Sequence, residues 1–272
     1  MFEARNLNVA LDRRTVVAGA YLFAPAGNVI AIVGPNGSGK TTLLRALSGE
    51  LSFTGTITLN GTDIRSLKPW QAASQRAVLS QSANLSFPFT VREVVAIGQS
   101  SGLSSMPARL AARLPEAALE RVDLGGFGGR LYQDLSGGEQ QRVQLARVLC
   151  QVWNPVVDGV PRYLLLDEPV SSLDIKHQLA IMQVARDFAD AGGGVIAILH
   201  DLNLAAMFAD RLVVMSRGRI AAAGPPHEVL NDALIGAVFD VPLHVDIRPD
   251  GVPVVLPQSW TRSFASPISR SS

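Results

Sequence analysis

The chain has 272 residues, 47% of them hydrophobic and 17% charged, and a formal net charge of +1. This composition excludes a disordered chain and gives no electrostatic reason to expect a nucleic-acid partner. No apolar run of the roughly 18 residues that a membrane-spanning helix needs is present, and no secretory signal pattern opens the chain. The single cysteine, Cys150, lies in an apolar helical pattern, so we expect it to be packed rather than reactive. These features favour a soluble cytoplasmic α/β protein.

Alternating apolar and polar residues begin the chain. Residues 2–33 predict two or three strands with turns at 12–14 and 25–27, and residues 54–64 predict a further strand. The run Val29–Val33 is wholly apolar and β-branched, as a buried parallel strand would be. We expect an antiparallel β layer beside this strand.

A glycine-rich loop links that strand to a helical pattern and matches the phosphate-binding motif Gly, four residues, Gly-Lys-Thr. Glycines let backbone N–H groups surround an anion, and the helix start adds a positive dipole end. We predict that Lys40 reaches the β- and γ-phosphates and that Thr41 ligates Mg²⁺. An ordinary glycine-rich turn is the disfavoured alternative. The predicted nucleotide-binding residues are Gly34, Pro35, Asn36, Gly37, Ser38, Gly39, Lys40, Thr41 and Thr42.

The middle third of the chain has a mainly helical pattern. Thr90 is a candidate N-cap with Glu93 at the third helical position. We expect a helical subdomain inserted into the α/β core. The predicted elements are a strand at 78–81, a helix at 91–97, a loop at 98–107 and a helix at 108–124.

From residue 137 the pattern is again helical, and Asn154–Pro155 ends that helix before a polar connector that reaches Arg162. Beyond Leu256 the sequence is rich in Ser, Pro and Arg, and we expect disorder there. The elements predicted between these points are strands at 163–167, 195–199, 212–215 and 219–222 and helices at 175–191 and 202–208.

Polar residues follow two further buried strands. Asp167 and Glu168 come after a run of leucines, and His200 follows the strand 195–199. Because ligands bind at the carboxyl ends of parallel strands, we expect these residues to converge on the phosphates. Asp167 suits the Mg²⁺ site, Glu168 could polarise an attacking water, and His200 suits a γ-phosphate sensor. A solvated turn for the acids and a satisfied core histidine are the alternatives.

The three other histidines, at 177, 227 and 244, have polar neighbours and no partner at a helpful spacing, so we expect surface positions for them. The segment Leu135–Arg142 places a serine and two glycines at a helix start, which is a second candidate anion site. One chain does not obviously bring it to the first loop, so an intermolecular role is plausible.

These motifs together resemble the ATP-binding cassette (ABC) ATPases. The resemblance covers about residues 2–245 and rests on the glycine loop, Leu-Ser-Gly-Gly-Glu at 135–139, and Leu-Leu-Leu-Asp-Glu-Pro at 164–169. It implies a P-loop NTPase with a RecA-like parallel-sheet core, an N-terminal antiparallel β subdomain and an α-helical subdomain inserted at about 85–150. Residues 246–272 would then be a partly disordered extension.

The resemblance also implies roles and an assembly. Two copies would bind ATP and Mg²⁺ head to tail as a homodimer, with Glu168 as general base and His200 as the switch histidine. Gln81 would be the Q-loop glutamine, which ligates Mg²⁺ with Thr41 and Asp167 and contacts the permease. The residues implied to close on the nucleotide of the other subunit are Ser136, Gly137, Gly138 and Glu139, with Asp174 from the D-loop 171–174.

Three further stretches, 85–98, 200–206 and 224–230, are similar to the ATPases of metal-chelate importers. The long connector at 150–162 resembles that of the hemin importer ATPases, although a surface insertion without bearing on cargo is the alternative. This implies two transmembrane permease subunits, an indirect role for a periplasmic binding protein, and a peripheral position on the cytoplasmic face of the inner membrane. The chain itself should not bind heme, because it has no visible pair of axial ligands.

One position departs from the family. Its usual adenine-stacking aromatic aligns with Val9, so Arg13 or Arg14 could cover the base instead. A siderophore or cobalamin importer, an exporter and a soluble ABC protein in DNA repair or translation are the weaker readings; the last generally needs coiled-coil insertions or a second cassette.

Overall fold

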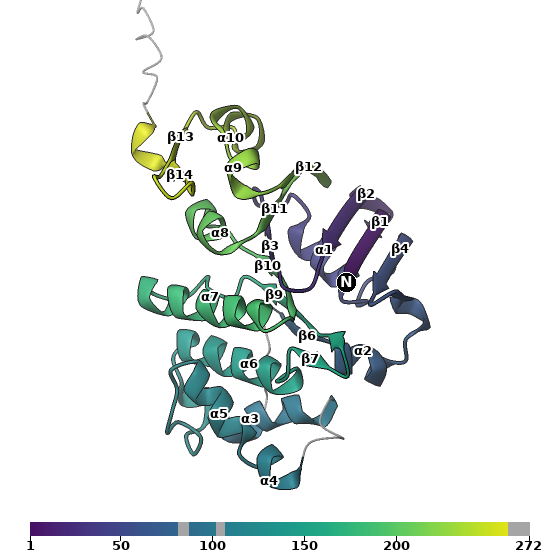
Figure 1. Cartoon of the computed structure of the whole chain (residues 1–272), viewed down its shortest axis with the longest axis vertical. Coiled ribbons are helices and arrows are strands. Elements are labelled where there is room, and N and C mark those ends of the chain that lie inside the picture. Colours follow the sequence, from purple (N-terminus) through teal and green to yellow (C-terminus); the bar gives the residue numbers. More distant parts are fainter. Residues whose placement is uncertain (81–86, 102–106, 261–272) are drawn as a thin grey trace, which may run out of the picture.

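The computed structural model describes residues 1–80, 87–101 and 107–260, and a six-stranded sheet forms its centre (Figure 1). Five of the strands run parallel and β12 pairs antiparallel with β11 at one edge. In sheet order the strands are β12 (Arg219–Gly224), β11 (Arg211–Ser216), β3 (Val29–Val33), β10 (Gly194–Ile198), β9 (Tyr163–Asp167) and β6 (Arg76–Leu79). Because β3, β10 and β9 are neighbours, the polar residues that follow them meet at one edge of the sheet.

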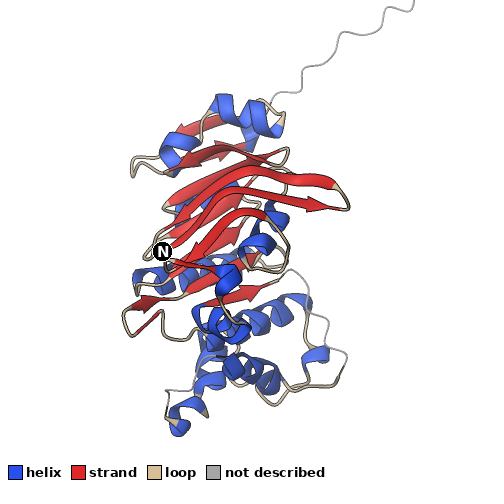
Figure 2. Ribbon diagram, turned by 90° about the vertical axis from the view of Figure 1, so that its right-hand side faces the viewer, coloured by secondary structure: helices blue, strands red, loops and turns tan. Residues whose placement is uncertain are grey.

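A second sheet of four antiparallel strands lies beside the first (Figure 2), which confirms the expected β layer. Its order is β2 (Arg14–Ala24), β1 (Phe2–Leu11), β4 (Thr54–Leu59) and β5 (Thr62–Asp63). Between the sheets lies α1 (Lys40–Leu47), the helix that follows the glycine loop.

Two hydrophobic cores cover the two faces of the six-stranded sheet. Ile30 and Ile32 of β3 pack with α1 and the antiparallel sheet. Val29, Ala31 and Val33 face the opposite core, which includes α7 (Ile175–Asp190) and α6 (Gly137–Gln151). Since every residue of β3 is buried, the strand is apolar throughout instead of alternating.

The helices α3 (Val91–Ile97), α4 (Ala108–Ala111), α5 (Leu114–Arg121) and α6 gather at one end of the molecule (Figure 1). The predicted cap of α3 is confirmed, because Thr90 and Glu93 form a capping box. The predicted helix at 108–124 is instead two helices, since Pro115 lacks an N–H and begins a new helix better than it continues one. The predicted loop at 98–107 begins as a 3₁₀ turn, Gly98–Ser101, and residues 102–106 lie outside the described part.

The connector after α6 also differs from the expectation. It forms a hairpin of β7 (Val156–Val157) and β8 (Val160–Pro161), with positive φ at both turn residues, Asp158 and Gly159. Asp-Gly between valines is a hairpin signal that the polar composition obscured. Cys150 before it is fully buried, and this burial raises the pKa of its thiol to about 12, as a packing role requires.

The last described segment contains a hairpin that the sequence did not predict. The expected boundary at residue 245 falls inside a strand of a C-terminal hairpin, while residues 261–272 lie outside the described part. Among the described helices, none is both long and apolar enough to cross a membrane. The remaining elements are α2 (Pro69–Gln75), α8 (Leu202–Phe208), α9 (Pro226–Val229), α10 (Asp232–Phe239), β13 (His244–Ile247) and β14 (Pro253–Leu256).

Candidate functional site

The glycine loop joins β3 to α1 with three glycines in conformations that other residues rarely adopt. Gly34, Gly37 and Gly39 have φ values of 147°, 74° and 100°. A Cβ at Gly34 would collide with the carbonyl oxygen of Met215, so that position requires glycine. Gly39 precedes α1 without any side-chain cap, which leaves the first N–H groups of the helix available to an anion.

Lys40 is held inside this loop. Its Nζ donates to the carbonyl oxygens of Gly34 (2.9 Å) and Pro35 (3.0 Å). Burial lowers the pKa of Lys40, and the carboxylates of Glu168 and Asp167 act in the opposite direction. The Lys40 ammonium group thus donates to two uncharged carbonyl oxygens. Hydrogen bonds to an anionic phosphate would be stronger.

The Ser38 hydroxyl also indicates an anion site, because it is buried without a hydrogen-bond partner. Beside it lies a cavity of about 210 Å³ that brings residues from three strand ends together. Its lining is Val16, Asn36, Gly37, Gly39, Lys40, Thr41, Thr42, Glu168 and His200. The loop, Glu168 and His200 thus converge as the sequence predicts.

Thr41 and Asp167 form the part of the site that suits Mg²⁺. The Thr41 hydroxyl donates to Asp167 Oδ1 at 3.3 Å, and Asp167 is only 5% exposed. Burial raises the pKa of Asp167 and nearby Glu168 raises it further, while the Thr41 hydrogen bond opposes this. The described residues contain no cluster of three acidic, histidine or cysteine ligands.

Glu168 and His200 are paired across two neighbouring strand ends. His200 Nε2 lies 2.6 Å from Glu168 Oε1. Glu168 has a φ of 52°, a left-handed conformation that costs roughly 1 kcal/mol for a non-glycine residue. Its backbone oxygen accepts from Gln141 Nε2 at 2.8 Å, a contact that fixes the strained residue from α6.

Gln81 lies outside the described residues, so its predicted role stays a prediction. The last described residue before it, Ser80, lines a larger cavity of about 420 Å³ that also borders Thr41 and Asp167.

The segment Ser136–Glu139 lies at the start of α6 and caps that helix. Glu139 Oε2 accepts from both the Ser136 N–H (2.8 Å) and the Ser136 hydroxyl (2.7 Å). Within the described residues, the lining of the Lys40 cavity includes no member of this segment. One chain therefore does not bring Ser136, Gly137, Gly138 and Glu139 to the glycine loop. Asp174 likewise caps its own helix, accepting from the His177 N–H at 2.9 Å.

Val9, which aligns with the family's adenine-stacking aromatic, is 1% exposed inside the antiparallel sheet, so its side chain offers almost no surface to a base. What covers the base in its place stays a prediction. Val16 lines the cavity, and sequence reasoning missed it because nothing in its neighbourhood marks it. Gln141 was also missed, although it belongs to the quoted segment Leu135–Arg142. The proposed roles of Arg13 and Arg14 stay predictions; both are exposed.

Comparisons with known proteins agree with this geometry. The ABC transporter family pattern matches residues 19–171. The hemin import ATP-binding protein HmuV of Mesorhizobium japonicum is 63% identical over 260 residues, covering 95% of this chain and 99% of that protein. Its counterpart of the same name in Chelativorans sp. is 59% identical over 263 residues, covering 95% and 99%.

Among solved structures, the dimeric structure of a bacterial ABC transporter cassette superposes with a TM-score of 0.72 at 24% identity, covering 83% of this chain and 99% of that one. At that identity the similarity shows a shared fold and nothing further. With the family match and the full-length relatives, the chain belongs to the ABC transporter family.

Proposed function

We propose that this protein is the ATP-hydrolysing subunit of an ABC importer that carries hemin. The ATPase assignment rests on one observation: Lys40, Glu168 and His200 line the same cavity. The cargo assignment is supported by the full-length relatives, whose names specify hemin import. A siderophore or cobalamin importer is the alternative, favoured by the similarity of 85–98, 200–206 and 224–230 to metal-chelate importers in general.

Binding of ATP is the first task of the site. The loop N–H groups and Lys40 hold the phosphates, and Lys40 exchanges its two carbonyl acceptors for phosphate oxygens. Thr41, Asp167 and Gln81 would hold Mg²⁺, which neutralises charge on the β- and γ-phosphates when bound. Asp167 would hold the cation in its ionised form, and the hydrogen bond from Thr41 favours that form by lowering the pKa of Asp167.

Hydrolysis requires a base opposite the γ-phosphate. Glu168 takes the proton of the attacking water, and His200, 2.6 Å from it, orients the carboxylate and faces the phosphate. The backbone hydrogen bond from Gln141 fixes Glu168 at the strand end. A movement of α6 would therefore displace Glu168 through this hydrogen bond.

The site of one chain is half of a complete site. We propose a head-to-tail homodimer in which Ser136, Gly137, Gly138 and Glu139, with Asp174, complete the nucleotide site of the second copy. Two membrane permease subunits would bind the helical region on the cytoplasmic face of the inner membrane, with the periplasmic binding protein acting through them. The ABC ATPase domain would occupy residues 2–245, with its helical subdomain at about 85–150.

Glu168→Gln tests the ATPase assignment. The variant should bind ATP as the wild type does but lose on the order of 10²–10⁴ in hydrolysis rate, the share that a general base supplies. ATP binding is measured by fluorescence titration and hydrolysis by phosphate release. Unchanged turnover would remove Glu168 from the role of base.

Reconstitution with the cognate permease and binding protein in liposomes tests the cargo. Hemin, a ferric siderophore and cobalamin are compared for stimulation of ATP hydrolysis, with an empty binding protein as control. Stimulation by hemin alone is expected. Stimulation by one of the other chelates would replace hemin and leave the ATPase assignment intact.

A further inference from the structure

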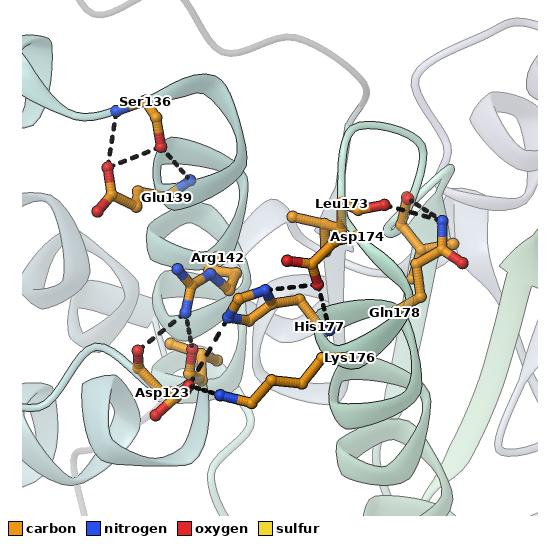
Figure 3. A network of polar contacts seen from close by, with 11 residues as sticks. Asp123, Ser136, Glu139, Arg142, Leu173, Asp174, Lys176, His177 and Gln178 are labelled. Atoms are coloured by element: carbon orange, nitrogen blue, oxygen red, sulfur yellow. Dashed lines mark hydrogen bonds and ion pairs between the residues drawn. The ribbon is translucent and has the colours of Figure 1, made fainter.

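A polar network joins the helical region to the start of α7 (Figure 3). It lies outside the lining of the Lys40 cavity, and its one residue with a proposed role at the nucleotide is Asp174. It centres on Asp123, in the turn that follows α5. Asp123 has a left-handed φ of 58°. Arg142 of α6 fixes this turn, because its Nη1 donates to the carbonyl oxygens of Val122 (3.0 Å) and Asp123 (2.8 Å).

The Asp123 carboxylate reaches across to α7. Its Oδ2 accepts from Lys176 Nζ at 3.2 Å and lies 3.7 Å from His177 Nε2. The hydrogen bond from Lys176 holds the pKa of Asp123 below its ordinary value, so the carboxylate is charged at neutral pH.

His177 has a carboxylate on each side of its ring. Its Nδ1 lies 2.8 Å from Asp174 Oδ1, while its Nε2 faces Asp123 (Figure 3). Asp174 Oδ1 also accepts the backbone N–H of His177, so this one residue holds Asp174 by two contacts. With 22% of its side chain exposed, the ring is enclosed more than either carboxylate.

The same two regions also touch near the predicted dimer surface. A Cβ added to Gly138 would lie 3.1 Å from Leu173 Cδ2 and 3.4 Å from the Ser172 oxygen, so the start of α6 packs directly on the segment 171–174. Gln178 of α7 also stabilises that segment, because its Nε2 donates to the Leu173 oxygen at 3.0 Å. The start of α6 and the segment 171–174 are thus held in one arrangement by contacts at both ends.

We propose that His177 is a positioning residue that ties Asp174 to Asp123 and thereby keeps the segment 171–174 in register with the start of α6. This inference rests on the proposed function, because it matters only if both segments act on the nucleotide of a second copy. Exposed ion pairs of this kind add little to folding stability. Their effect should therefore appear in turnover rather than in stability.

His177→Ala and Asp123→Ala test the proposal in the assembled transporter. Each should lower the kcat of ATP hydrolysis by about tenfold, less than the roughly 100-fold that a 1 Å misplacement of reacting groups can cost. The KM for ATP should stay within about twofold, since neither residue belongs to the glycine loop. The double variant should be no slower than the slower single variant, because the two residues act as one unit.

His244→Ala is the matched control. His244 pairs with Asp232 at 3.0 Å in the C-terminal part of the chain, away from the network. It should leave kcat unchanged. His177→Arg supplies N–H donors for both carboxylates and should recover most of the lost rate.

Three results would overturn the proposal: wild-type kcat in His177→Ala, a rise in KM that accounts for the whole loss, or additive effects in the double variant. The readout is ATP turnover relative to the wild type, without added chelate. If hemin fails to stimulate the wild type, the cargo assignment fails while the His177 comparison still stands. If the wild type hydrolyses no ATP, the proposed function itself fails.

Discussion

Two helices in this protein begin at glycine-rich segments, and their starts are built in opposite ways. α1 follows Gly39 and has no side-chain cap. α6 follows Ser136, whose hydroxyl and N–H are both bonded to Glu139 while the Ser136 hydroxyl accepts the N–H of Glu139. The first start has no side-chain acceptor for its donors, whereas the second satisfies the N–H groups of Ser136 and Glu139 internally.

The difference indicates what each start is for. The uncapped start lies beside the Ser38 hydroxyl, which is buried without a hydrogen-bond partner, and beside Lys40, so it suits an anion. A self-capped helix start needs no ligand to satisfy its capped N–H groups, so it can remain exposed until a second surface binds it. In the proposed dimer, the Ser136 hydroxyl would donate to a phosphate only after giving up its hydrogen bond to Glu139 Oε2, so its contribution would depend on closure of the dimer.

The largest expected contrast is between alanine at Gly34 and at Gly137. Gly34→Ala adds a Cβ against the Met215 carbonyl at a positive φ and should destabilise the protein by roughly 3 kcal/mol or more. Gly137→Ala has no atom within 4 Å of its new Cβ and should leave the free energy of unfolding nearly unchanged. Urea denaturation of both variants measures this, and equal stabilities would contradict the contrast.

Removing the cation from the open start should come next in size. Lys40→Ala loses at least two charge-assisted hydrogen bonds to phosphate, which corresponds to a fall in ATP affinity of about 100-fold or more. Lys68→Ala removes an exposed lysine and serves as control. Titration with a fluorescent ATP analogue provides the measurement. Near-wild-type affinity in Lys40→Ala would contradict the role of the loop.

The sequence predicts the open start well because its signals are local. The strand Val29–Val33, the glycines and Lys40 are contiguous, and each follows from a backbone or charge requirement that neighbours do not alter. The capping boxes of α3 and α6 are local in the same sense, since each cap and its partner are three residues apart.

The remaining parts depend on contacts between distant residues. Gln141 and Glu168 are 27 positions apart, and Lys176 and Asp123 are 53 apart, so neither contact has a sequence signal. The burial of Val9 also depends on distant residues, because β1 pairs with β2 and the register of that pairing shifts on both sides of Val9.

A smaller effect is expected when the self-capped start loses its serine. Ser136→Ala removes the N-cap of α6 and should cost about 1 kcal/mol in the free energy of unfolding. ATP binding by the single chain should not change, but hydrolysis by the assembled transporter should fall because the hydroxyl no longer meets the phosphate. Thr90→Ala removes the equivalent cap of α3 and is the matched control. It should show the stability loss without the same loss of hydrolysis.

The smallest expected effect is a pH dependence of the α6 cap. Hydrogen bonds from the Ser136 side chain and backbone hold the pKa of Glu139 below its ordinary value. Because the folded-state pKa is the lower one, this stabilisation is complete above the unfolded value of about 4.3 and is lost as pH falls through the folded-state pKa.

Glu139→Gln keeps the cap geometry without a titrating group. The free energy of unfolding of the wild type relative to this variant should therefore fall by about a few tenths of a kcal/mol between pH 6 and pH 3, a small value because solvent screens the exposed carboxylate. Denaturation curves of both proteins across that range give the difference, and a difference that grows toward low pH would contradict the assignment. Glu93→Gln, at the equivalent box of α3, should show a change in the same direction, because hydrogen bonds from Thr90 lower the pKa of Glu93. If only Glu139 responds, the effect would come from something other than the cap, such as the nearby positive charges of Arg142 and Arg130.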